Sequence, residues 1–212
     1  MRNECASRIV DEKIIMEPEE KLKLYLNKLA NEVTLLSSSY KLLIYLNESL
    51  SKYKNEMMEA PGFFNLVIIS LGNYIIITLA KIFENPNRSD LNLYKFLNFI
   101  EQNSKKINFK KGKNYSLVEN RRLIDENSNK IDTILKWRDK SFAHYDKKFL
   151  QEGILPKEFP LTKDDLKTLI DISKKIVNMY CDLFEVENIA VEYSNCDDIE
   201  NIFYILKKIK EK

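Results

Sequence analysis

The sequence has few of the residues that build metal sites, disulfides and tight turns. Its 212 residues include one histidine, three cysteines, four glycines and five prolines. The cysteines (Cys5, Cys181 and Cys196) are odd in number, widely spaced and form no Cys-x-x-Cys pair. Such a set disfavours a disulfide framework and leaves few ligands for a transition metal. We therefore predict no bound metal, no cofactor and a reducing, cytoplasmic location.

The overall composition favours a helical globular protein without a general affinity for nucleic acid. Scarce glycine and proline favour long helices over sheets with many tight turns. The hydrophobic fraction of 44% is enough for a core, and the formal net charge is only +2. Any binding to nucleic acid must therefore use a local basic patch.

One uncharged run, residues 60–80, has the length of a membrane span. About 20 apolar residues cross a bilayer. Asn65 and Asn73 interrupt this run, which is unfavourable in lipid but tolerable in a helical bundle. The flanks also lack clustered Lys/Arg residues and tryptophans. We predict a central helix of a bundle and keep a membrane span as the open alternative.

Apolar residues recur at three- and four-residue steps through most of the chain, which indicates amphipathic helices. Ser116 with Glu119 and Thr162 with Asp165 have the spacing of capping boxes. Ser89 is a further candidate cap. The pattern predicts helices over residues 18–58 (one helix, or two meeting near the serines 37–39), 63–84, 89–103, 116–145, 162–185 and 199–210.

The remaining segments show no repeat and no alternation of strands with helices. Residues 147–160 look irregular, and residues 189–193 fit a brief extended piece. We predict an all-α bundle of about five to six helices with a short C-terminal helix. The predicted organisation is an N-terminal arm (1–17), a helical bundle (18–186), and a C-terminal arm with an amphipathic helix (187–212).

The single histidine, His144, lies in the stretch Trp-Arg-Asp-Lys-Ser-Phe-Ala-His-Tyr-Asp of residues 137–146. Imidazole titrates near neutrality, so His144 suits the transfer of a proton from or to an RNA hydroxyl. Arg138 offers a planar fork that matches phosphate oxygens. Asp139 could orient either side chain, and Ser141 could hold the histidine or a phosphate. These residue types are the ones that RNA cleavage without a metal would need: a base near the 2′-hydroxyl and a cation near the phosphate.

Helix geometry complicates this site. Six residues at about 100° each leave Arg138 and His144 about 120° apart on an ideal helix. One straight helix would not direct both side chains at the same atom. The helix could be distorted here, the two side chains could enter a groove from different angles, or a second copy of the chain could complete the site across a two-fold axis.

These residues resemble the HEPN superfamily (higher eukaryotes and prokaryotes nucleotide-binding). Its signature is Arg, four to six residues and His, with Asn or Asp directly after Arg; here five residues separate Arg138 from His144. Residues 79–84, followed by a polar turn and an amphipathic helix from Leu91, resemble the branch named after AbiU-type abortive-infection proteins. That branch commonly reads Arg-Asp-Lys, two residues, Ala-His, one residue, Asp, which residues 138–146 follow. The resemblance covers roughly residues 20–185.

The resemblance implies a helical bundle, frequent dimers with facing motifs, and metal-independent endoribonuclease activity in toxins or antiviral defence. It implies Arg138 and His144 as the catalytic pair with Asp139 in support, an RNA substrate, a homodimer with a composite site, and an antitoxin or defence-system partner. Toxins paired with a nucleotidyltransferase antitoxin carry a tyrosine two places after the histidine. Here Asp146 holds that place and tyrosine comes earlier, as Tyr145, which argues against regulation by tyrosine modification.

Other interpretations stay open. HEPN-like domains also serve as non-catalytic interaction modules, in which Arg138 and His144 would be packed inward with no cleft beside them. A membrane-associated protein that uses residues 60–80 is a third, weaker alternative. The lysine-rich stretch 104–115 is a weak candidate for phosphate binding, although such runs are more often solvated loops. Its lysines are Lys105, Lys106, Lys110, Lys111 and Lys113.

Overall fold

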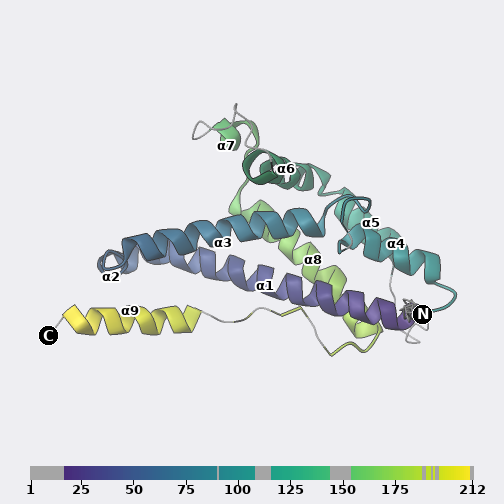
Figure 1. The fold of residues 1–212 in the computed structure, drawn as a ribbon, viewed down its shortest axis with the longest axis horizontal. Helices are drawn as coiled ribbons and strands as arrows, with labels where there is room; N and C mark the ends of the chain where they lie inside the picture. Colours follow the sequence, from purple (N-terminus) through teal and green to yellow (C-terminus); the bar gives the residue numbers. More distant parts are fainter. Residues whose placement is uncertain are drawn as a thin grey trace, which may run out of the picture.

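The computed structural model describes residues 17–89, 91–107, 116–143, 154–187, 190, 191, 193 and 196–210. In this part of the chain all regular structure is helical, which confirms the prediction of an all-α fold (Figure 1). The helices are α1 (Pro18–Lys52), α2 (Lys54–Met57), α3 (Pro61–Ile82), α4 (Leu93–Asn103), α5 (Leu117–Asp125), α6 (Ser128–Arg138), the π-helical turn η1 (Asp139–Ala143), α7 (Ile154–Glu158), α8 (Lys163–Leu183) and α9 (Cys196–Lys210).

Helix α1 settles the alternative left open for residues 18–58, because it runs unbroken for 35 residues. Its buried serines do not end the helix. Ser38 donates its hydroxyl to the Thr34 carbonyl (2.8 Å) and accepts the Tyr193 backbone N–H (2.8 Å). Thr34 accepts the Val191 backbone N–H (3.1 Å). These hydroxyls therefore fasten the described part of the C-terminal arm to α1.

The main core lies where α1, α3 and α8 meet. Figure 1 shows α1 and α3 running side by side with α8 crossing them. Leu22, Leu26 and Leu29 on α1 are fully buried, as the helical spacing predicts. Phe96 of α4 packs edge to face against Tyr180 of α8, with 5.0 Å between ring centroids. The α4 segment therefore closes one end of this core.

Two predicted helix starts have different outcomes. Thr162 and Asp165 form the predicted capping box of α8. For α4, however, the cap is Asn92 and not Ser89: its side chain accepts the Lys95 backbone N–H (2.7 Å). Asn92 is fully buried. The Tyr25 hydroxyl accepts the Asn92 backbone N–H (2.9 Å) and donates to its carbonyl (3.1 Å), so both backbone groups have a partner. Tertiary contact thus moves the start of the helix three residues along the chain.

Residues 116–145 do not form the single helix that was predicted. The chain breaks at residues 126–127 between α5 and α6. Asn127 donates its side-chain amide to the Leu123 carbonyl (2.9 Å) while its own carbonyl accepts from Lys130 and Ile131. The Asn127 backbone N–H donates to the Ile124 carbonyl (3.0 Å), three residues back and not four, so the α-helical ladder is interrupted here. Residues 154–158, expected to be irregular, form α7, in which Pro156 sits within the first turn, where proline is tolerated.

A second, smaller core joins α9 to the tip formed by α1, α2 and α3. It consists of Leu46, Met57, Phe64 and Phe203, all nearly or fully buried. The Phe203 ring lies 4.4 Å from the Tyr53 ring and 5.6 Å from the Phe64 ring. Beside it, the Glu200 carboxylate accepts from Tyr45, Tyr53 and Lys52, the last at 2.9 Å. The C-terminal helix is therefore held by both an aromatic contact and a polar clamp.

The Glu200 clamp predicts a loss of α9 docking in acid. Hydrogen bonds from Tyr45 and Tyr53, and then from Lys52, lower the pKa of Glu200 from 4.5 to about 2. A lowered carboxyl pKa contributes stability above the unfolded value, and this stability is lost as pH falls from 4.5 towards about 2. The protection of the α9 amides from hydrogen exchange, relative to the intrinsic exchange rate at each pH, should therefore fall over this range in the wild type. In Glu200→Gln the α9 amides should be less protected at neutral pH, and their protection should not fall over this range. An equal fall in both proteins would contradict this role of Glu200.

Helix α3 combines a buried and an exposed part. It is the one described helix that is long and apolar enough to cross a membrane by length and composition, and 28% of its most apolar window is buried. Its C-terminal half supplies Ile75, Leu79 and Ile82 to the main core, as expected of a bundle helix. Its N-terminal half exposes Phe63 and Leu66 by 60% and 64%. The prediction of a central helix thus holds for half of α3.

Candidate functional site

Arg138 lies at the C-terminal end of α6 between two carboxylates. Its Nη1 donates to Glu84, which directly follows α3 and Phe83. Its Nε donates to the Asp139 carboxylate (2.8 Å), and its Nη2 lies 2.7 Å from the same oxygen. The guanidinium is thus held on two sides, by the residue that follows it and by a residue just beyond the end of α3.

The two carboxylates differ in how firmly they are placed. The Glu84 side chain is only 7% exposed, and its second oxygen accepts the Asn85 backbone N–H (2.9 Å). The Asp139 side chain is 43% exposed. Glu84 is therefore the fixed partner of Arg138, and Asp139 is the partner that a ligand in solvent could displace.

These two partners stabilise the charged form of Arg138. Burial disfavours the charged guanidinium and lowers its pKa, but the hydrogen bonds to Glu84 and Asp139 outweigh burial and raise the pKa of Arg138 overall. The side chain is 20% exposed, so part of the fork remains open to solvent. A guanidinium has five N–H donors, and among the described residues the two carboxylates engage Nε, Nη1 and Nη2.

The helix changes register directly after Arg138. Residues 139–143 form the π-helical turn η1, in which the repeat is i to i+5. The helix is therefore distorted over residues 139–143, which is one of the three possibilities considered above, while His144 itself lies outside the described residues. Single π turns of this kind are frequent at functional sites.

Trp137 ties the motif to the segment that follows it. The indole Nε1 donates to the Phe159 carbonyl (2.8 Å), and the Lys136 ammonium lies 5.1 Å from the centre of the Phe159 ring. These contacts fix the end of α6 against the chain beyond α7. Trp137 thus anchors the C-terminal end of α6.

The structure brings together some of the predicted residues. Arg138 and Asp139 are in direct contact, and Ser141 lies partly exposed in η1. Lys105 and Lys106 are exposed in the turn after α4 and are not partners of Arg138. His144, Tyr145, Asp146, Lys110, Lys111 and Lys113 lie outside the described residues, and their roles stay predictions.

Glu84 is the site residue that the sequence did not single out. It is 54 residues from Arg138, and only the fold brings them together. The available signal was an acidic residue four positions after the uncharged run 60–80, next to a turn at residues 85–88. A carboxylate that ends such an apolar run needs a buried cationic partner if it stays in the core.

An all-α bundle with an Arg-Asp pair at the end of a helix, shortly before a histidine, defines the chain as a HEPN-superfamily domain. The family model HEPN_AbiU2, described as AbiU2, matches residues 19–194. The chain therefore belongs to the AbiU2 family, the branch of the superfamily related to abortive infection. Neither a curated protein nor a solved structure matches the chain.

Proposed function

We propose that the protein is a metal-independent HEPN endoribonuclease of a bacterial antiviral or toxin–antitoxin system. The observation that carries the proposal is the placement of Arg138: a guanidinium held by a buried carboxylate, on the turn that leads to the only histidine. The family membership supports a role in abortive infection. We further propose that it acts in the cytoplasm.

Arg138 would bind the scissile phosphate. Glu84 keeps Nη1 in place, and a phosphate oxygen displaces Asp139 from Nε and Nη2 as a two-point contact. Such a preset cation stabilises charge that grows on the phosphate oxygens in the transition state without first having to reorient. Asp139 would then lose its contact with the Arg138 guanidinium when RNA binds and regain it when RNA leaves.

His144 would transfer a proton in the cleavage reaction. The 2′-oxygen attacks the adjacent phosphorus while its proton passes to a base, and the bond from phosphorus to the 5′-oxygen breaks as that oxygen takes up a proton. His144 serves as the base or as the acid. The other transfer falls to water or to the His144 of a second copy. The products are a 2′,3′-cyclic phosphate and a 5′-hydroxyl.

The test is cleavage of total RNA in EDTA by the wild type and by His144→Ala. We expect the wild type to cut and the variant to lose about 100-fold or more in rate, the usual contribution of a general base or acid. Equal rates in the two proteins would contradict the proposal. A folded wild type without activity under varied conditions would favour the alternative, a non-catalytic interaction module.

We also propose that a second copy completes the site. The exposed apolar side chains of α3 offer a surface for self-association, namely Phe63, Leu66, Ile69 and Ile77. If Arg138 and His144 of different copies work together, mixing Arg138→Ala with His144→Ala chains restores one intact site in each mixed dimer. About a quarter of the wild-type activity should return, since half of the dimers are mixed and each has one of two sites.

Two outcomes would contradict this assembly. No recovery on mixing, with mixed dimers shown by native mass spectrometry, would place both residues of each site in one chain. Recovery of the wild type only in the membrane fraction, and not in the soluble fraction without detergent, would assign the α3 surface to a bilayer, the membrane alternative.

A further inference from the structure

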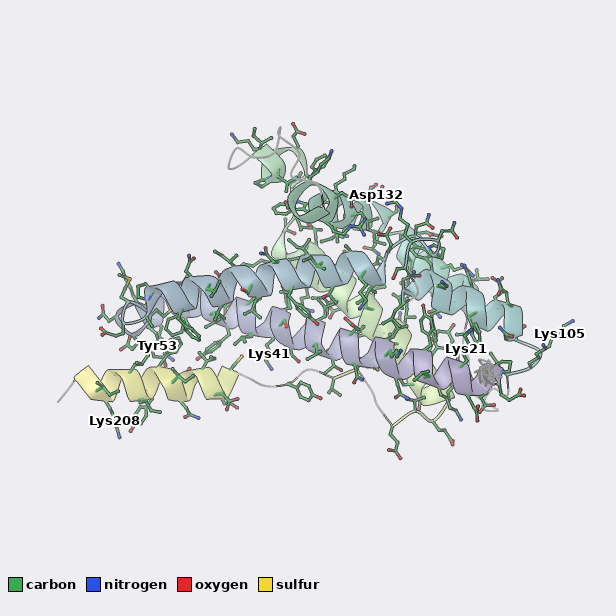
Figure 2. The ribbon with its side chains drawn as sticks, viewed as in Figure 1. Lys21, Lys41, Tyr53, Lys105, Asp132 and Lys208 are labelled. Atoms are coloured by element: carbon green, nitrogen blue, oxygen red, sulfur yellow. The ribbon has the colours of Figure 1, made fainter. Side chains whose placement is uncertain are left out.

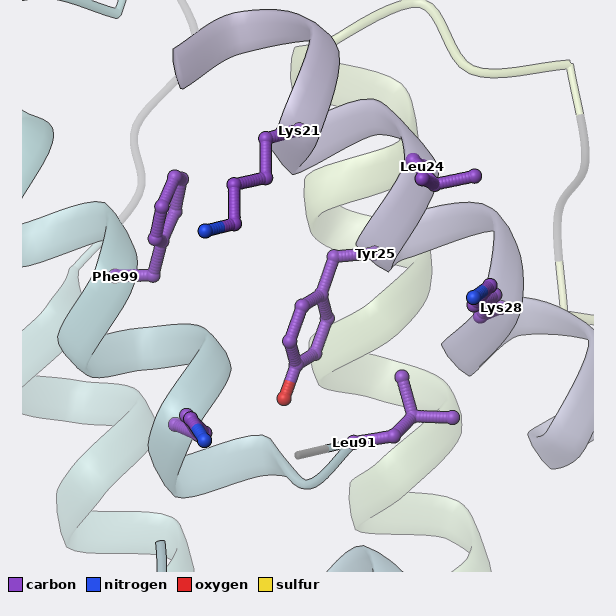
Figure 3. Close-up of a pocket in the computed structure, with 7 residues that line it drawn as sticks. Lys21, Leu24, Tyr25, Lys28, Leu91 and Phe99 are labelled. Atoms are coloured by element: carbon purple, nitrogen blue, oxygen red, sulfur yellow. The ribbon is translucent and has the colours of Figure 1, made fainter. Parts of the chain in front are cut away.

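Three lysines and two aromatic rings line a pocket between α1 and α4. The pocket has a volume of about 410 Å³ and is lined by Lys21, Leu24, Tyr25, Lys28, Leu91, Lys95 and Phe99. Figure 3 shows the Lys21 amine directed between the rings of Tyr25 and Phe99. None of these lining residues is acidic, so the pocket suits a ligand with negative charge and a flat apolar part.

The sequence of α1 places its four lining residues on one face. Lys21, Leu24, Tyr25 and Lys28 follow the spacing i, i+3, i+4 and i+7 of a single helical stripe. Lys21 and Lys28 are separated by about 10 Å along the axis, which is wider than one phosphate group. The lysines therefore fit successive phosphates of a chain better than a single one.

The pocket is already formed around a fixed ring. Tyr25 is held by two hydrogen bonds to the backbone of Asn92 and stacks on Phe96, with 5.7 Å between centroids. Phe99 is partly buried, and the Lys21 ammonium lies 5.5 Å from the centre of its ring. Beside the fixed Tyr25, the partly buried Phe99 ring offers a surface on which a flat base could stack, which is the usual device for binding single strands without sequence preference.

Two more lysines lie at this end of the bundle, where the first turn of α1 also carries Glu19 and Glu20. Lys105 and Lys106 follow α4 directly, and Figure 2 shows Lys105 and Lys21 at the same end of the bundle. Leu91 of the pocket is seven residues from Glu84, the fixed partner of Arg138. Seven residues span at most about 25 Å, so a strand of several nucleotides could bridge pocket and site.

We propose that this pocket is a binding subsite for single-stranded RNA, in which Lys21, Lys28 and Lys95 contact the phosphates and Phe99 stacks a base. The choice of RNA rests on the proposed ribonuclease function. Binding can be measured without cleavage, so the two proposals can fail separately.

The experiment uses the full chain with His144→Ala and a fluorescent single-stranded RNA of about 12 nucleotides, within the usual range for single-strand sites. Replacing Lys21, Lys28 and Lys95 by alanine should weaken binding about tenfold. It should also reduce the slope of log K against log salt by about 2, since three phosphate contacts are lost. Phe99→Leu should weaken binding about tenfold and leave the slope unchanged, because stacking and not charge is lost.

The matched control replaces three exposed lysines of α8 and α9, namely Lys163, Lys175 and Lys207, and removes the same net charge. It should keep both affinity and slope. Equal weakening in the two triple variants, or no weakening in the pocket variant, would overturn the subsite. Binding of ATP through the pocket lysines with no binding of RNA would also overturn it, because the pocket would then serve a free nucleotide.

In chains with His144 intact, the pocket variant should raise KM for RNA cleavage and leave kcat nearly unchanged. Loss of RNA binding in the pocket variant, with no cleavage by the wild type, would support the subsite while contradicting the ribonuclease.

Discussion

Arg138→Ala is expected to lower RNA cleavage at least about 100-fold and to lower the free energy of unfolding by about 3 kcal/mol. Loss of one preset donor to a developing oxyanion costs about 100- to 1000-fold in rate. Removal of one partner of a buried ion pair costs about 3–5 kcal/mol because the other charge remains buried. Glu84 would be that remaining charge, with 7% of its side chain exposed. Cleavage rates and urea unfolding measure the two effects.

The double variant Glu84→Gln with Arg138→Ala separates the two effects. It removes the buried charge, so we expect it to recover a large part of the lost unfolding free energy. Its cleavage should stay as low as that of Arg138→Ala, because the phosphate contact is still missing. Recovery of cleavage together with stability would mean that Arg138 acts only on the fold.

Phe203→Ala is expected to release α9 from the tip of the bundle. Truncation of a fully buried phenylalanine costs about 3 kcal/mol or more, and Phe203 is fully buried between Tyr53 and Phe64. This loss corresponds to an increase of about 100-fold in hydrogen exchange of the α9 amides. Helix α9 lies beyond the residues that the family model matches, so α8 and the main core should keep their protection.

Tyr204→Ala is the matched control for Phe203→Ala. Tyr204 is the next residue of the same helix and is 55% exposed. Its removal should change exchange in α9 by less than about threefold, since exposed substitutions usually stay within about 0.5 kcal/mol. Equal acceleration in the two variants would show that helix propensity, and not the aromatic contact, holds α9.

The helices were largely predictable because their signals are local. Apolar spacing placed the buried faces of α1 and α4, and Thr162 with Asp165 gave the cap of α8. The errors arose where the helical ladder is interrupted locally or a distant residue intervenes. The predicted helix over residues 116–145 is interrupted at Asn127, whose backbone N–H bonds to Ile124, and Tyr25 makes Asn92 the cap of α4.

The candidate site was predictable only where its residues are close in sequence. Arg138 and Asp139 stood out because they share a short motif with His144. Glu84 did not, because its partner is 54 residues away. The π-helical turn after Arg138 and the joining of Lys21 and Lys28 with Lys95 in one pocket also depend on packing between helices, which spacing along one helix does not report.

The most direct test of the central claim is the chemistry of the new RNA ends. A short synthetic RNA is incubated with the wild-type protein in EDTA, and the products are weighed by mass spectrometry. The matched substrate has a single 2′-deoxy nucleotide at the position that is cut. The account predicts a 2′,3′-cyclic phosphate from the all-RNA substrate and no cut at the deoxy position. Cleavage at the deoxy position, or unchanged cleavage by His144→Ala, would contradict it.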